Sequence, residues 1–149
     1  MSITSISSLD SSPTFVMGII YKQFRKISGP MLSQQFDITL EMLAVLRALY
    51  EKGSISQQQL ADILKRERSA AKRLADNCIK RGFVAAKSHP ENKKIKILII
   101  TKEGLQTLAQ ANVAITQLSN EFLAPLTKTE QTQLLGLAEK LFRHEIMVD

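Results

Sequence analysis

Lysine and arginine are concentrated in one stretch of this chain. Twelve of them lie between positions 65 and 102, against three acidic residues, so this stretch has a formal net charge of +9. The whole chain has a net charge of +6, and the remaining residues therefore sum to −3. Ammonium and guanidinium groups gathered in this way bind polyanions, above all the phosphates of nucleic acids. The sequence thus indicates a polyanion-binding surface, formed by a basic segment within a mildly acidic body.

The basic stretch begins where two short helices are predicted to meet. Ser56-Gln57-Gln58-Gln59 matches a capping box, which opens a helix that continues to Leu64. Residues 65–68 form a turn, and a second helix follows to about Arg81. Gly82 is the natural left-handed terminator of that helix. This spacing predicts a helix-turn-helix unit.

The second helix has a narrow apolar side, formed by Ala71, Leu74, Ala75 and Cys78, and its basic residues lie mainly off that side. The DNA major groove admits one α-helix, whose N-terminal half reaches the base edges while flanking cations meet phosphates. The residues predicted to enter the groove are Ser69, Lys72 and Arg73, and those predicted at the DNA backbone are Gln57, Arg66 and Arg68. For one such helix alone, a solvated charged face is the alternative interpretation.

After Gly82 the apolar period changes from that of a helix to that of a strand. Residues 83–87 and 94–99 read as two strands, joined by the polar turn 89–93. The lysines of this hairpin, Lys93, Lys94 and Lys96, are predicted to follow the phosphates or to enter a minor groove. A basic wing next to a helix-turn-helix makes DNA binding a better explanation than a solvated face.

Helices are also predicted on both sides of this unit. Ser12-Pro13 should start one that Gly29-Pro30 ends, and a second follows Thr39. Thr101 caps a long helix, and Thr127-Lys128-Thr129-Glu130 is a capping box that opens the last one. The predicted fold is mostly α with a small β wing, a winged helix-turn-helix with N- and C-terminal dimerisation helices.

The terminal helices carry more apolar surface than a small winged domain can cover, which favours a symmetric dimer. We expect a flexible polar tail at 1–12, an N-terminal dimerisation region at 13–36, a winged DNA-binding domain at 37–101 and C-terminal dimerisation helices at 102–149. The residues predicted to form the dimer interface are Phe15, Ile19, Leu118, Phe122, Leu137 and Leu141.

Other classes of function find little support in the sequence. No phosphate loop, dinucleotide fingerprint, HExxH motif or nucleophile elbow is present, so we expect no enzyme, no catalytic residue and no cofactor. The first twelve residues lack a secretory signal, and the longest strongly apolar run, residues 97–100, is too short for a membrane span. The chain is expected to be cytoplasmic, with no membrane partner.

Cys78 is the single cysteine, and His89 and His144 are the only histidines, so no metal-ligand spacing is recognisable. Because Cys78 lies on the inward side of its helix, we interpret it as a buried structural residue. A reactive thiol would need exposure and cationic neighbours. A cysteine-based oxidant sensor of the same fold remains an alternative.

The order and spacing of these segments resemble the MarR family of bacterial regulators over nearly the whole chain, from about Pro13 to Phe142. The resemblance is carried by Ile38-Thr39 with Leu43 and Leu46, Ser56 to Ala61, Ser69 to Gly82, Gly82-Phe83-Val84, and Leu98 to Gly104. It implies an obligate homodimer on a near-palindromic operator. It also implies a small-molecule effector, aromatic or amphipathic, held between the dimerisation helices and the winged domain.

Two departures from that family pattern affect DNA recognition. Asn92 and Lys94 stand where the wing tip usually has Asp and Arg, and lysine lacks the planar fork of arginine. Ala70 and Ala71 replace Thr and Val of the recognition helix. We predict a sequence-specific regulator of transcription, a repressor released by its ligand, with a wing that is directed mainly to phosphates. A protein-interaction module with a degenerate winged helix is the alternative from another class.

Overall fold

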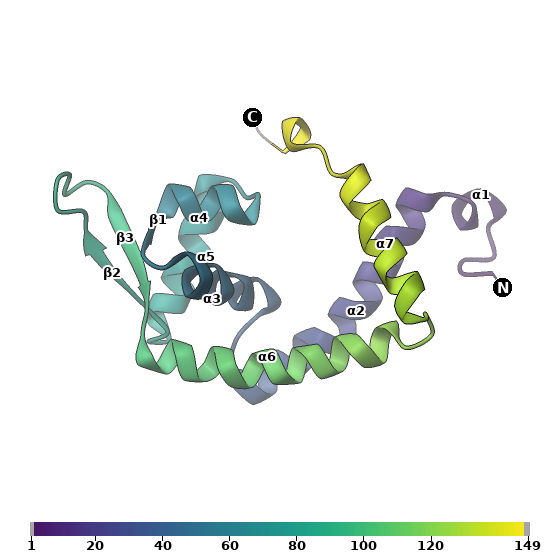
Figure 1. Ribbon diagram of the computed structural model, residues 1–149, viewed down its shortest axis with the longest axis horizontal. Helices are drawn as coiled ribbons and strands as arrows, with labels where there is room; N and C mark the ends of the chain where they lie inside the picture. Colours follow the sequence, from purple (N-terminus) through teal and green to yellow (C-terminus); the bar gives the residue numbers. More distant parts are fainter. Residues whose placement is uncertain (1, 148–149) are drawn as a thin grey trace. The chain divides into compact units, whose positions relative to one another are not determined.

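The computed structural model describes residues 2–147, which form two compact units that divide after Leu40. The first unit contains helices α1 (Ser7–Asp10) and α2 (Pro13–Phe36). The second contains α3 (Leu40–Lys52), β1 (Ile55–Ser56), α4 (Gln57–Leu64), α5 (Arg68–Lys80), β2 (Val84–Ser88), β3 (Lys96–Ile100), α6 (Lys102–Leu123), α7 (Lys128–Leu141) and the 3₁₀ turn η1 (His144–Ile146) (Figure 1). The structure is a mostly helical fold with a small sheet, as predicted.

Residues 2–12 contain a helical turn, α1, where composition predicted only a polar tail. The carboxylate of Asp10 accepts hydrogen bonds from the hydroxyl groups of Ser2 and Thr4, each at 2.7 Å. It also accepts one from the backbone N–H of Thr4, at 2.7 Å. These bonds, that of Ser2 first, lower the pKa of the Asp10 carboxyl group. Met1 of the predicted tail lies outside the described residues.

Helix α2 begins as predicted, with Ser12 as its N-cap and Pro13 in its first turn. The prediction that Gly29-Pro30 ends it is wrong, because the helix continues to Phe36 with Pro30 inside it. A proline removes one backbone donor and usually costs about 3 kcal/mol in a helix interior. Leu32 follows the proline and is fully buried. Such burial is the kind of tertiary contribution that outweighs local propensity. The helix ends at Phe36, and the next residue, Asp37, has the left-handed φ of 54°.

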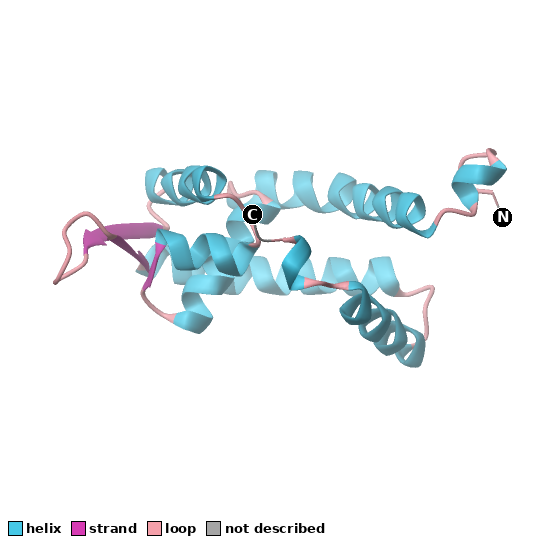
Figure 2. Ribbon diagram, turned by 90° about the horizontal axis from the view of Figure 1, so that it is seen from above, coloured by secondary structure: helices cyan, strands magenta, loops and turns pink. Residues whose placement is uncertain are grey.

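The sheet of the second unit has the strand order β1–β3–β2, and both pairs are antiparallel. In the hairpin, Val84 pairs with Ile100 and Lys87 with Ile97, so the strands lie one or two residues beyond the predicted ones. Strand β1 was not predicted. Figure 2 shows the three strands gathered at one end of this unit, and the β2–β3 hairpin extends from the helices as a wing (Figure 1).

Leucines from helices α3 and α4 and strand β3 form the centre of the second unit. The fully buried ones are Leu43, Leu46, Leu49, Leu60 and Leu98. Helix α3 ends at Gly53, which has a φ of 76°. Each predicted helix start in this unit is present, including the complete capping boxes at Ser56 and Thr127. The two hydrogen bonds from Thr127, its backbone N–H first, lower the pKa of the Glu130 carboxyl group.

Thr101 ties the beginning of α6 to the end of the preceding helix and the start of the wing. Its hydroxyl donates to the carbonyl oxygen of Gly82 at 2.6 Å and accepts from the N–H of Gly104 at 3.1 Å. Its own N–H donates to the carbonyl oxygen of Phe83 at 3.0 Å. A Cβ atom at Gly104 would overlap that Phe83 oxygen and lie 2.8 Å from Cγ1 of Ile100. Only glycine allows this close approach.

Gly104→Ala is therefore expected to destabilise the fold by about 1–3 kcal/mol, the usual cost of overpacking. Urea unfolding at matched protein concentration measures this loss. Gly18→Ala is the control, because a Cβ atom there meets nothing within 4 Å and alanine raises helix stability by about 0.5–1 kcal/mol. Equal stability of Gly104→Ala and the wild type would contradict the close approach.

Helices α6 and α7 differ in how much of their surface is covered. Helix α6 buries Leu108, Ala111 and Ile115, whereas α7 has no buried residue. Four leucines of α7 are 51–62% exposed, namely Leu134, Leu135, Leu137 and Leu141. Among the described residues, no helix combines the length and apolar character that a membrane crossing needs.

Candidate nucleic-acid interface

Helices α4 and α5 pack together through small side chains and are joined by a tight turn. Ala61 of α4 and Ala71 and Ala75 of α5 are almost completely buried, which lets two helix backbones approach closely. Lys65 has a φ of 54°, and the N–H of Arg66 donates to the carbonyl oxygen of Ala61 at 3.0 Å. The predicted helix-turn-helix is therefore present.

The outward side of α5 is polar and basic. Ser69, Lys72 and Arg73 are exposed, while Cys78 lies on the buried side together with the two alanines of this helix. Successive outward positions recur every three or four residues, so their side chains project in one direction. The exposed side of α5 is thus the side that carries Ser69, Lys72 and Arg73.

A hollow of about 960 Å³ lies where the starts of α4 and α5 face the wing. It is lined by Ser56, Gln57, Gln58, Glu67, Arg68, Ser69, Lys72, Lys94, Ile95 and Lys96. Four of these residues are cationic and one is acidic. The hollow thus brings together six of the nine residues that the sequence predicted for DNA binding, from segments up to 40 positions apart.

The other three predicted residues lie outside this hollow. Arg73 is exposed farther along α5, and Lys93 is exposed in the turn of the wing. A guanidinium nitrogen of Arg66 lies 3.9 Å from a carboxylate oxygen of Glu41. Contact of any of the nine with DNA stays a prediction.

Gln57 has an unusual side chain within the hollow. Its amide nitrogen is buried and has no hydrogen-bond partner among residues 2–147. Buried polar atoms in folded proteins nearly always have such a partner. Gln57 therefore has an unsatisfied donor in a lining that also holds four cations.

The turn of the wing is held by local hydrogen bonds. The side-chain oxygen of Asn92 accepts from the N–H of Lys94 at 3.1 Å, and Nδ1 of His89 accepts from the N–H of Glu91 at 3.1 Å. Asn92 therefore shapes the turn, a role that the sequence comparison with an acidic wing tip did not predict. Asx side chains commonly bond to the backbone two residues on, and this pattern could have identified it.

Cys78 is fully buried. Burial raises the pKa of its thiol to about 12, although the nearby Arg81 guanidinium acts in the opposite direction. A thiol with this pKa is protonated at neutral pH and reacts poorly, since the thiolate is the reactive form. The surroundings of Cys78 support a structural role. Within the described part of the chain, no three His, Cys, Asp or Glu residues group as a metal site.

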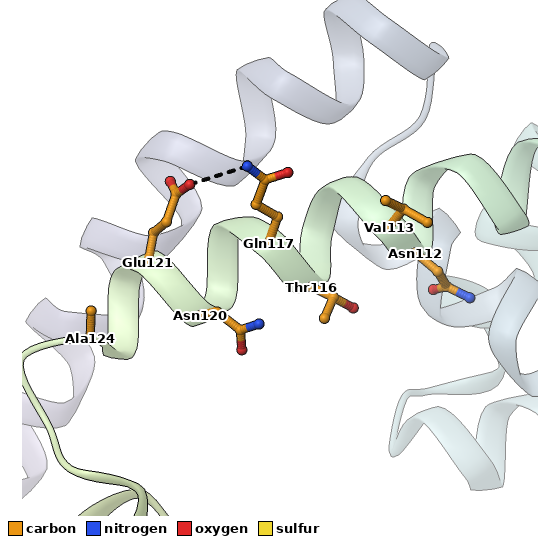
Figure 3. A pocket seen from close by; sticks show the side chains of 7 residues that line it. All are labelled: Asn112, Val113, Thr116, Gln117, Asn120, Glu121 and Ala124. Atoms are coloured by element: carbon orange, nitrogen blue, oxygen red, sulfur yellow. Dashed lines mark hydrogen bonds between the residues drawn. The ribbon is translucent and has the colours of Figure 1, made fainter.

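A second hollow follows one flank of α6 (Figure 3). It is lined by Asn112, Val113, Thr116, Gln117, Asn120, Glu121 and Ala124, with a hydrogen bond of 3.4 Å between Gln117 and Glu121. Six of these residues belong to α6, and the seventh, Ala124, is its C-cap. The hollow is therefore an open flank that needs another surface to become an enclosed binding site.

The predicted dimerisation residues occur in both units. Leu137 and Leu141 of α7 are each 59% exposed, and Phe15 of α2 is also exposed. Ile19, Leu118 and Phe122 are half-buried. These positions supply apolar surface for a partner, and the dimer itself stays a prediction.

Comparisons with known proteins agree with this geometry. Residues 38–96 match the model of the MarR family. The chain is 27% identical over 108 residues to the HTH-type transcriptional regulator BilQ of Clostridium symbiosum, covering 72% of this chain and 75% of that protein. It is 28% identical over 105 residues to the transcriptional regulator HosA of Escherichia coli O111:H-, covering 70% and 78% respectively.

Solved structures show the same fold. A mutant of MarR from E. coli, complexed with operator DNA, superposes with a TM-score of 0.79 at 22% identity, covering 86% of this chain and 91% of that one. The PcaV transcriptional regulator from Streptomyces coelicolor, in complex with its natural ligand, gives a TM-score of 0.78 at 21% identity, covering 95% and 96%.

Proposed function

Because this chain belongs to the MarR family, whose model its residues 38–96 match, we propose that it is a homodimeric regulator that binds a near-palindromic operator in double-stranded DNA. Each subunit places α5 in a major groove and its wing along the adjacent backbone. The two copies of α5 lie roughly 34–36 Å apart, one turn of the duplex. The protein acts in the cytoplasm as a repressor and has no enzymatic activity.

The hollow between α4, α5 and β3 carries this proposal. It brings Arg68, Lys72, Lys94 and Lys96 into one lining, together with Gln57. Phosphate contacts fix the position of a protein on the duplex, and base contacts specify the sequence. Lys94 and Lys96 are suited to the first task, and Ser69, Lys72 and Arg73 of α5 to the second.

The proposed effector is a small aromatic or amphipathic molecule. The PcaV structure is described as a complex with its natural ligand, which supports ligand control by analogy. An effector changes DNA affinity only as far as it prefers one spacing of the two α5 helices over another. Release of the repressor follows if the effector prefers a spacing that does not match one turn of DNA.

A salt titration tests the proposal. Genomic fragments retained by the purified protein supply the operator, and its affinity is then measured from 50 to 200 mM salt. Each phosphate neutralised contributes about −0.9 to the slope of log affinity against log salt, so four cations in each of two subunits predict a slope of about −7. A slope near zero, or retention of no duplex by an intact dimer, would favour a protein-interaction module.

A further inference from the structure

An acidic residue stands on the outward side of α5, where the proposed function has only donors and cations. Asp76 lies three residues after Arg73 and seven after Ser69, on the same side of the helix. One oxygen of its carboxylate, Oδ2, accepts a hydrogen bond from Nζ of Lys72 at 2.7 Å. Both side chains are about half exposed, at 55% for Lys72 and 47% for Asp76.

This pair leaves hydrogen-bonding capacity unused on both partners. A lysine ammonium group has three donors, and that of Lys72 uses one of them on Asp76. The second carboxylate oxygen of Asp76 accepts no hydrogen bond from any residue of the described range 2–147. A donor and an acceptor are therefore held side by side and face solvent together.

A G·C base pair presents the complementary arrangement in the major groove. Guanine offers the acceptors O6 and N7, and cytosine offers the N4 amino donor. O6 and N4 are themselves joined by a hydrogen bond, whose ordinary length is about 2.9 Å. The Lys72–Asp76 separation of 2.7 Å matches this spacing closely. Lysine to guanine and aspartate to cytosine are also the pairings that base-edge geometry favours.

We propose that Lys72 and Asp76 act together as a donor–acceptor reader of one G·C base pair in each half of the operator. This inference rests on the proposed function, since it requires α5 to lie in the major groove. Asp76 thereby determines specificity in two ways. Its carboxylate gains a donor at the matching base pair, and it repels phosphates wherever the protein binds an arbitrary sequence.

The test compares the wild type with Asp76→Asn, which keeps the shape of the side chain and removes its charge. For the wild type, replacing the contacted G·C pair by A·T should lower affinity by about 5- to 150-fold, the range for one base-edge contact. For Asp76→Asn this preference should fall at least about 2-fold, because the neutral amide oxygen is a weaker acceptor than a carboxylate oxygen. Its affinity for a duplex without the operator should rise by about 3- to 10-fold.

Asp62→Asn is the matched control. It removes the same charge from an exposed position of α4, where the Asp62 carboxylate accepts from the side chain of Gln58 at 3.0 Å. It should leave base preference and non-operator affinity as in the wild type. If Asp76 only stabilised α5, Asp76→Asn would change operator and non-operator affinity slightly and by the same factor, because an exposed ion pair within one helix contributes little.

The outcomes separate this inference from the function on which it rests. If the wild type retains no duplex at low salt, both are wrong. If the wild type selects an operator but Asp76→Asn keeps the same base preference, or if the preferred pair at this position is A·T, only the reader is wrong. Loss of preference in Lys72→Ala as well as in Asp76→Asn would support the pair acting as one unit.

Discussion

A variant in which Lys72 and Arg73 are both alanine should bind the operator at least about 100-fold more weakly than the wild type. Each base-edge contact contributes about 1–3 kcal/mol, and tenfold in affinity corresponds to 1.4 kcal/mol. A dimer loses the two contacts in both half-sites, so even the lower values exceed this factor. Fluorescence anisotropy with a labelled operator duplex measures the change.

The fold should survive this double substitution. Both side chains are exposed, and alanine is the best helix former at such positions. Circular dichroism and light scattering should therefore show unchanged helicity and mass. Replacing Lys22 and Lys26 of α2 by alanine removes the same charge elsewhere and should weaken binding far less. Equal losses of operator affinity in the two double variants would mean that Lys72 and Arg73 contribute to binding only through their charge.

The parts of this fold that the sequence predicted correctly depend on local signals. The capping boxes at Ser56 and Thr127 involve residues only three apart, and both are complete in the structure. Gly82 follows the end of α5 with a φ of 80°. This conformation is strained for residues that have a side chain, and glycine adopts it readily. Such signals need no knowledge of the rest of the chain.

The features that were missed depend on distant partners. Strand β1 has two residues and exists because Ile55 pairs with Leu98, far along the chain. A search for strands of four or more residues cannot find it. Helix α2 passes Pro30, whose local effect is to stop a helix. In both cases the tertiary environment decides the outcome, and one sequence window does not contain it.

The candidate site shows the same division. The basic stretch was evident from charge, and the structure gathers most of its predicted residues around one hollow. A count of charges, however, treats Lys72 as an independent cation, whereas its ammonium group lies 2.7 Å from the carboxylate of Asp76. The spacing of four residues could have revealed this pair, since such positions are neighbours on a helix. The distance between Lys72 and Asp76 therefore changes the role that we expect for Lys72, which the charge count had already identified.

Replacing Leu137 and Leu141 by glutamate should convert the dimer into monomers and lower operator affinity at least about 100-fold. These positions lie one helical turn apart, on the same side of α7 as Leu134, and each is 59% exposed. Full burial of a fully exposed leucine contributes about 1.5–3 kcal/mol. Burying the exposed 59% of Leu137 and Leu141 in both subunits therefore contributes at least about 3.5 kcal/mol, which the variant loses. Sedimentation velocity measures the mass, and anisotropy measures DNA affinity.

In that variant the DNA-binding surface stays unchanged. DNA affinity is lost because the two subunits separate. A second half-site binds at high effective concentration only while the two winged domains are joined. Gln133→Glu is the control, because it also introduces glutamate into α7, but at an exposed polar position. It should leave both mass and DNA affinity as in the wild type. A variant of twice the chain mass with full operator affinity would mean that α7 does not hold the subunits together, and the apolar side of α7 would then need another occupant.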